Sequence, residues 1–345
     1  MRKLLLPLLT LAAVTLFLGP PAVAAGTLRI LAYEGYADDD WIKAFEQQTG
    51  ARVNVVFAGS PEEMFAKMQG SAGADYDLVA IDTSIVKRYL DNGLIQPMDA
   101  SKLTNLPNLQ PAFAGIPQTR PDGKRYAVPI AWGSLGLVYS LDEFKEAPTS
   151  WNVLWDPKYK GRVGIPAYGW VGNSWLQVLN KTLGGNEDNV DPAIAFLAEL
   201  MKKNQPIIIE NADAGLKAFA REEIVIMPYW NGRTHVLQSQ GVPVDIEYVP
   251  GTMVVAPAFP ILKGGKFIEL ANRFCNLSMD GEYQMGMVKR FFYPPSNGKI
   301  KLPPELVKYA FPLDKEKNVV KIDYEKMNAH KSQYLDRWNK EVLGA

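Results

Sequence analysis

The sequence predicts an α/β protein built from two domains. At 345 residues the chain exceeds the size at which a single hydrophobic core normally stops growing. Strand-like and helical segments alternate along it, which is typical of open α/β sheets. Its 47% hydrophobic and 21% charged residues are typical of a soluble globular protein. A formal net charge of +0 gives no excess of positive charge with which to bind nucleic acid.

Residues 1–24 form a separate segment. Arg2 and Lys3 precede an apolar run that ends at Leu18, and Ala22-Val23-Ala24 supplies the small residues of a cleavage site. The apolar run is shorter than the roughly 20 residues needed to cross a bilayer. We therefore expect a cleaved signal peptide and an exported product, with an uncleaved anchor as the alternative.

The first part of the mature chain is predicted to be a βαβαβ unit. Trp41 and Phe45 lie at helical spacing before a stop at Gly50, and Ser60-Pro61-Glu62-Glu63 has the cap, proline and acids of a helix start. The expected strands are 28–32, 53–57 and 78–81, and the expected helices are 40–49, 62–68 and 83–92.

The rest of the chain continues the alternation in a second lobe. A surface loop (103–123) precedes a strand (126–130), an extended segment (132–140) and a short capped helix within 148–161, where Trp151 and Trp155 are expected to be core residues. The remaining strands are expected at 162–165, 207–209, 224–228, 244–248 and 253–262, and the remaining helices at 173–183, 192–204, 212–221 and 266–277. A glycine-rich aromatic loop is expected after residue 165. The strand patterns run without a flexible linker near 132–139 and 251–260, so we expect crossings there that form a hinge.

Several functional classes are disfavoured by the residues present. The single cysteine, Cys275, cannot form an internal disulfide and is predicted to be a buried helix residue. His235 and His330 are the only histidines, and no metal-ligand spacing, nucleophile with its base, Walker loop or dinucleotide fingerprint occurs. We therefore expect no enzyme activity, no metal and no cofactor.

An ordered set of short motifs resembles the periplasmic solute-binding proteins of the spermidine/putrescine type, which are family 1 extracellular solute-binding proteins of ABC importers. The similarity covers nearly the whole mature chain. The motifs are Tyr33-Glu34-Gly35-Tyr36, 45–50, Tyr76-Asp77-Leu78-Val79, 93–99, Tyr126-Ala127-Val128-Pro129 with Trp132-Gly133, 149–161 and Trp230-Asn231-Gly232.

This resemblance implies a two-lobed fold of the periplasmic-binding-protein type (type II), with a mixed sheet flanked by helices in each lobe and a ligand cleft between them. Lobe 1 would comprise 25–131 and 254–305, and lobe 2 would comprise 132–253 and 306–345. The implied protein is a periplasmic monomer that closes on a small ligand and delivers it to an ABC permease in the inner membrane, without binding nucleic acid.

The resemblance also implies the residues that bind the ligand. Aromatic rings shield alkyl or ammonium groups from water, and loops at strand ends converge on the cleft. The candidates are Tyr33, Tyr36, Thr83, Ser84, Tyr168, Trp170, Trp230, Arg233 and Tyr293.

Departures from the polyamine-binding pattern point to a different ligand. Carboxylates that would pair with ammonium groups are missing after 163–165 and at 254–258, and Arg233 stands where an acid can lie. A guanidinium pairs with carboxylate or phosphonate groups, so we favour a zwitterionic or anionic ligand such as an ω-amino acid, an aminophosphonate or an opine-like compound.

Alternatives remain open. Arg233 could instead form a solvated or hinge salt bridge. The protein could be a true polyamine binder that uses Glu34, Asp38 or Asp82, or a sugar, thiamine or iron receptor of the same fold.

Overall fold

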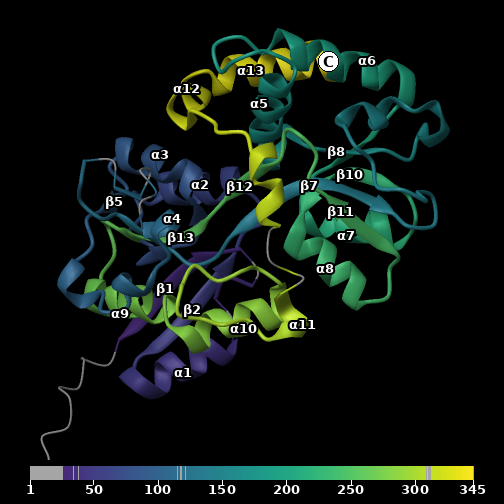
Figure 1. Ribbon diagram of the computed structural model, residues 1–345. Helices are drawn as coiled ribbons and strands as arrows, with labels where there is room; N and C mark the ends of the chain where they lie inside the picture. Colours follow the sequence, from purple (N-terminus) through teal and green to yellow (C-terminus); the bar gives the residue numbers. More distant parts are fainter. Residues whose placement is uncertain are drawn as a thin grey trace, which may run out of the picture.

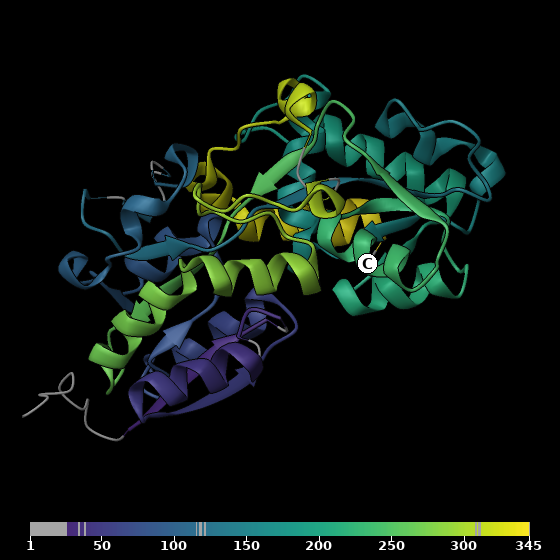
Figure 2. The same ribbon diagram turned by 60° about the horizontal axis from the view of Figure 1, so that its bottom comes forward.

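The computed structural model describes residues 26–33, 35–37, 39–114, 116, 119–120, 122–307, 309 and 312–344. The expected signal peptide lies outside these residues. The predicted α/β class is confirmed: Figures 1 and 2 show two bodies side by side, each with strands covered by helices.

The first sheet contains the predicted βαβαβ unit. Its parallel strands have the order β2-β1-β3, and Ser60 caps α2 by accepting a hydrogen bond from the N–H of Glu63 at 3.2 Å. Alternate residues of β1 face opposite sides, because Leu28 and Ile30 pack with α1 and α9 whereas Leu31 packs with α2 and α3. The elements are β1 (Thr27–Ala32), α1 (Asp39–Thr49), β2 (Arg52–Phe57), α2 (Pro61–Gly70), β3 (Leu78–Val79), α3 (Val86–Asp91) and α9 (Ile268–Ser278).

Strand β13 (Pro257–Leu262) returns antiparallel through this sheet and pairs with four of its strands. The expected single strand 78–81 is wrong, since it is interrupted at Ala80, and the expected helix 83–92 begins as a 3-10 turn. The remaining elements of this region are β4 (Ile81–Asp82), η1 (Thr83–Ile85), β5 (Ile95–Gln96) and β6 (Ala127–Pro129).

The second sheet is centred on β7 (Gly133–Ser140), to which three strands pair antiparallel. These are β10 (Ile226–Trp230), β11 (Val244–Glu247) and β12 (Met253–Val255). A separate parallel pair is formed by β8 (Gly164–Pro166) and β9 (Ile207–Ile209). The helices are α5 (Asn173–Thr182), α6 (Asp191–Asn204), α7 (Ala212–Ala220) and α8 (Asn231–Ser239).

The chain passes between the sheets at neighbouring places. The expected strand 253–262 breaks at Ala256, where the chain leaves the second sheet and enters the first at Pro257, a residue without an N–H. The N–H of Ile130 donates to the carbonyl of Pro257 at 2.8 Å, so the two crossings lie side by side. The domain boundaries given above stay a prediction.

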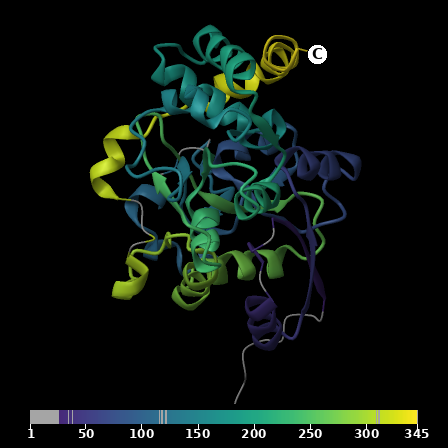
Figure 3. The ribbon, with the colours of Figure 1, turned by 90° about the vertical axis from the view of Figure 1, so that its right-hand side faces the viewer.

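The last part of the chain forms helices that no sequence pattern predicted. Tyr334, Trp338 and Val342 are buried in the core of the second body, because α13 packs on α5 and η9 packs on α6. Figure 3 shows the yellow C-terminal helix beside the teal helices of that body. The elements are α10 (Gly281–Phe291), α11 (Pro304–Val307), η8 (Leu313–Asn318), α12 (Tyr324–Ala329), α13 (Lys331–Arg337) and a π-helical end, η9 (Trp338–Leu343).

Three local expectations are also corrected. The short helix within 148–161 is two 3-10 turns, because Asp156 is extended between them, and the expected loop 103–123 contains short helical turns. The glycine-rich aromatic loop is a π-helical turn, η7 (Tyr168–Gly172), that leads directly into α5. The short turns are η2 (Ala100–Lys102), η3 (Leu106–Asn108), α4 (Pro111–Ala114), η5 (Trp151–Trp155) and η6 (Pro157–Tyr159).

The expected core position is confirmed for Trp151, whereas Trp155 is partly buried and packs against the core. Trp151 is 3% exposed and its indole N–H donates to the carbonyl of Pro250 at 3.0 Å, whereas Trp155 stacks on Phe196. Cys275 is fully buried in α9, where burial raises the pKa of its thiol. This thiol is therefore a packing group.

The carboxylate of Asp77 ties β1 to the start of α9. It is fully buried and accepts hydrogen bonds from the guanidinium of Arg29 at 2.9 and 3.1 Å, and from the backbone N–H groups of Arg29, Lys266 and Phe267. Burial alone would raise the pKa of Asp77, but these donors lower the pKa below its ordinary value. The ionised carboxylate is thus part of the folded structure.

Replacing Asp77 by Asn should lower the free energy of unfolding by about 3–5 kcal/mol, because Arg29 is left without its buried partner. Urea denaturation at pH 7 measures this. The stabilising effect of Asp77 should disappear as the pH falls through its lowered folded pKa. Asp91→Asn, which removes an exposed pair with Lys87, should cost about 1 kcal/mol or less. Equal urea-denaturation midpoints for Asp77→Asn and Asp91→Asn would show that the buried pair of Asp77 with Arg29 does not stabilise the fold.

Candidate functional site

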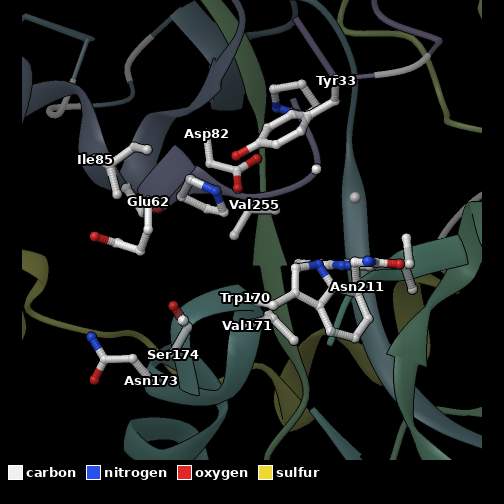
Figure 4. A pocket seen from close by; sticks show the side chains of 18 of the residues that line it. Tyr33, Glu62, Asp82, Ile85, Trp170, Val171, Asn173, Ser174, Asn211 and Val255 are labelled. Atoms are coloured by element: carbon white, nitrogen blue, oxygen red, sulfur yellow. The ribbon is translucent and has the colours of Figure 1, made fainter. Parts of the chain in front are cut away.

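A cavity of about 200 Å³ lies between the two bodies. Eight of the nine candidate residues line it: Tyr33, Tyr36, Ser84, Tyr168, Trp170, Trp230, Arg233 and Tyr293. The ninth candidate, Thr83, does not line the cavity. It is buried, and its backbone N–H donates a hydrogen bond to the carbonyl of Ala256 at 2.9 Å. Figure 4 shows side chains from the first body facing Trp170 and Asn211 of the second.

Asp82 lies at the carboxyl end of β4, in the wall that the first body contributes. No hydrogen bond or ion pair joins its carboxylate to another residue in the described part of the chain, although part of the side chain is exposed to the cavity. Burial raises the pKa of Asp82 to about 7, because water cannot fully solvate the ionised form. A cationic group in the cavity would supply the missing partner.

Tyrosine side chains surround this carboxylate. Burial, together with the negative charge of Asp82, raises the pKa of four of them: Tyr33, Tyr36, Tyr293 and Tyr324. The rings of Tyr33 and Tyr36 meet edge to face with centroids 5.6 Å apart, and the hydroxyl of Tyr33 is buried without a described partner. Aromatic rings beside an unpaired carboxylate suit an ammonium group.

The opposite wall carries the positive charge. Arg233 lies in the first turn of α8, its side chain is 19% exposed, and its Nη1 lies 3.5 Å from a carboxylate oxygen of Asp213. Asp213 itself is half exposed in the first turn of α7. The salt bridge that was an alternative for Arg233 therefore exists, but the guanidinium also lines the cavity.

The Trp230-Asn231-Gly232 motif has a local structural explanation. The side-chain oxygen of Asn231 accepts a hydrogen bond from the backbone N–H of Ser134 at 3.0 Å, which fixes the start of α8 against β7. A Cβ on Gly232 would lie 2.6 Å from the carbonyl oxygen of Phe291 and 2.8 Å from the ring of Tyr293. Only glycine allows Tyr293 to approach α8 and reach the cavity.

Tyr168 and Trp170 come from η7. The hydroxyl of Tyr168 donates to the backbone carbonyl of Lys331 at 2.8 Å, so this side chain holds the last helices against η7 as well as lining the cavity. Trp170 packs edge to face on Tyr229, with ring centroids 6.1 Å apart. Its indole forms the wall opposite Asp82 in Figure 4.

A second carboxylate, that of Glu62 in α2, also lines the cavity. It pairs with Arg88 of α3 at 3.1 Å and with Lys331 of α13. Burial would raise the pKa of Glu62, but hydrogen bonds from Arg88 and Lys331 lower it below its ordinary value. Glu62 is therefore ionised and neutralised by the protein itself.

Some lining residues were not predicted as ligand-binding. Asp82 was named only as a carboxylate for the polyamine alternative, although its place directly after a predicted strand is a signal for a cleft residue. Glu34 and Asp38, named with it, lie outside the described residues. The unpredicted lining side chains with polar groups include Glu62, Asn173, Ser174, Asn211, Asn328 and Lys331. Lys331 has no local signal, because the fold of the last helices was not predicted.

The described residues contain no group of three or more His, Cys, Asp or Glu side chains placed to hold a metal ion. In the same part of the chain, no helix combines the length and apolar character that crossing a membrane requires.

Comparisons with known proteins agree with this architecture. Residues 40–312 match the family described as bacterial extracellular solute-binding protein. The spermidine/putrescine-binding periplasmic protein 1 of Haemophilus influenzae is 27% identical over 296 residues, covering 83% of this chain and 80% of that protein.

Solved structures share the fold. A putative spermidine/putrescine ABC transporter protein from Listeria monocytogenes has a TM-score of 0.76 at 21% identity, covering 90% of this chain and 98% of that one. The Atu4243-GABA receptor has a TM-score of 0.74 at 20% identity, covering 92% and 97%. The resemblance drawn from the motifs is thus confirmed, and the chain belongs to the bacterial extracellular solute-binding protein family.

Proposed function

We propose that this protein is the periplasmic receptor of an ABC importer, and that it binds a small ligand carrying one ammonium and one anionic group. An ω-amino acid such as 4-aminobutanoate is the simplest ligand of this class. The observation that carries the proposal is the pair of opposite charges on facing walls: Asp82 without a described partner, and Arg233 with one weak, half-exposed partner.

The ammonium end would bind at Asp82. An ammonium taken out of water needs a carboxylate, and Asp82 regains a counter-charge when the ligand enters. The surrounding tyrosine rings favour a cation through their negative faces and exclude water from the pair.

The anionic end would bind at Arg233. The first turns of α7 and α8 both line this wall, through Asn211, Asp213 and Gly232, and the partial positive charge at helix N-termini favours an anion there. A ligand carboxylate would compete with the exposed carboxylate of Asp213 for the guanidinium.

Two observations bear on the choice among ligand classes. The relatives include a spermidine/putrescine-binding protein, and the similar folds include a GABA receptor, so the fold carries ligands with and without an anionic group. The guanidinium of Arg233 in the cavity favours a ligand with an anionic group for this chain. We further infer that the two bodies close on the ligand, because its two ends contact different bodies.

Removing Arg233 tests the anionic end. Arg233→Ala should weaken 4-aminobutanoate binding by about 2–5 kcal/mol, because a charge-assisted and largely desolvated pair is lost. Tyr33→Ala should weaken it by about 1–3 kcal/mol through lost aromatic contact, and the exposed Arg221→Ala should leave it unchanged. Titration calorimetry measures all three. If Arg233→Ala retains full affinity while Tyr33→Ala does not, the ligand has no anionic group at Arg233.

The raised pKa of Asp82 predicts a pH-dependent stability of the unliganded protein. Between pH 4 and 7 the unfolded chain has lost a proton that the folded protein keeps, so the free energy of unfolding falls as pH rises. Asp82→Asn should therefore stabilise the unliganded protein at pH 8, by about 4 kcal/mol at most, and should have little effect at pH 4.

Denaturation of both proteins at pH 4 and pH 8 measures this difference. Asp91→Asn serves as the matched control, because Asp91 is half exposed and pairs with Lys87. A stability change of Asp82→Asn that is the same at both pH values would mean that this carboxylate is not held unpaired in a buried site.

A further inference from the structure

Glu62 is the one lining carboxylate whose charge is fully engaged by two cations among the described residues. Arg88 reaches both of its oxygens, at 3.1 and 3.3 Å, and the ammonium of Lys331 binds the first of them. Arg88 also lies over the ring of Phe65, with its guanidinium carbon 3.7 Å from the ring centroid, which fixes it in the first body. Lys331 is the partner that comes from elsewhere.

Lys331 is held in place by the second body. Its backbone carbonyl accepts the hydroxyl of Tyr168, and three and seven residues later Tyr334 and Trp338 are buried in the second core. Its side chain is 23% exposed and lines the same cavity as Asp82. The chain thus brings an ammonium of its own to a carboxylate in the ligand cavity.

We propose that Lys331 is a specificity-determining residue that occupies the position a second ligand ammonium would take. This inference rests on the proposed function and narrows it: with Glu62 occupied, the described wall that the first body contributes offers a single ammonium site, at Asp82. Diamines would therefore be rejected, and ligands with one ammonium accepted.

The local charge disfavours a second ligand ammonium, as does the occupation of Glu62 by Lys331. Glu62, Arg88 and Lys331 together carry one net positive charge, so a second ammonium approaching them meets repulsion and finds no free carboxylate oxygen. Specificity of this kind comes from an element that disfavours the wrong ligand rather than from an added contact to the right one. Replacing Lys331 by a neutral residue would restore the charge pattern that a diamine needs, because the ligand ammonium then takes the place of the lysine ammonium.

The experiment compares Lys331→Met with the wild-type protein, using calorimetry against 1,3-diaminopropane, putrescine, cadaverine and 4-aminobutanoate. The diamine series allows for the spacing between the two carboxylates. At least one diamine should bind Lys331→Met about tenfold or more tightly than it binds the wild type. The double variant Lys331→Met with Glu62→Gln should lose that gain.

Lys326→Met is the matched control. Lys326 lies in the preceding helix, is half exposed, pairs with Asp188 and does not line the cavity, so its replacement should give no gain in diamine binding. Lys331→Gln repeats the test with a polar side chain, and 4-aminobutanoate binding by either Lys331 variant reports that its site is folded.

The outcomes separate this inference from the proposed function. Strong putrescine binding by the wild type would overturn the proposed function. Wild-type binding of 4-aminobutanoate, with no diamine gained by Lys331→Met or Lys331→Gln, would overturn the role of Lys331 alone. A diamine gain that survives Glu62→Gln would also overturn it, because the gain would not arise at Glu62.

Discussion

The site depends on the backbone hydrogen bonds that join the segments crossing between the two sheets. Ile130 donates to Pro257, Thr83 donates to Ala256, and Trp132 donates to Pro294. These bonds satisfy buried backbone groups where the sheets end, and they fix the two walls around one cavity. Asp82 directly precedes Thr83 and Tyr293 directly precedes Pro294, so the same backbone bonds that hold the fold also place the charged and aromatic groups of the candidate site.

The proposed ligand chemistry rests on the distribution of charge in the cavity. Burial raises the pKa of Asp82, and no described residue pairs with it to offset this, whereas hydrogen bonds from two cations of the protein lower the pKa of Glu62. Among the described residues, Arg233 has one ion-pair partner, the half-exposed Asp213 at 3.5 Å. The carboxylates of Asp82 and Glu62 lie on one wall but differ in pKa because their surroundings differ. Residue type alone does not reveal this difference.

Much of the fold followed from local patterns, and the charge pairing did not. The Ser60 cap, the spacing of Trp41 and Phe45, and the strand patterns were sufficient for the βαβαβ unit, whereas the candidate lining residues came from the resemblance to the solute-binding proteins. The break at Ala256 and the last helices depend on tertiary packing, because Tyr334 and Trp338 are stabilised by a distant core rather than by a local pattern. Lys331 meets Glu62 across 269 residues of sequence, a separation that only the folded chain shows.

Proton release on binding tests the central claim, that a ligand ammonium pairs with Asp82, most directly. At pH 6.5 much of Asp82 is protonated, and the groups of 4-aminobutanoate do not titrate there. Calorimetry in two buffers of different ionisation enthalpy should show a net release of protons on binding, which vanishes at pH 8.5 and in Asp82→Asn. Binding at pH 6.5 without any proton release would contradict this account.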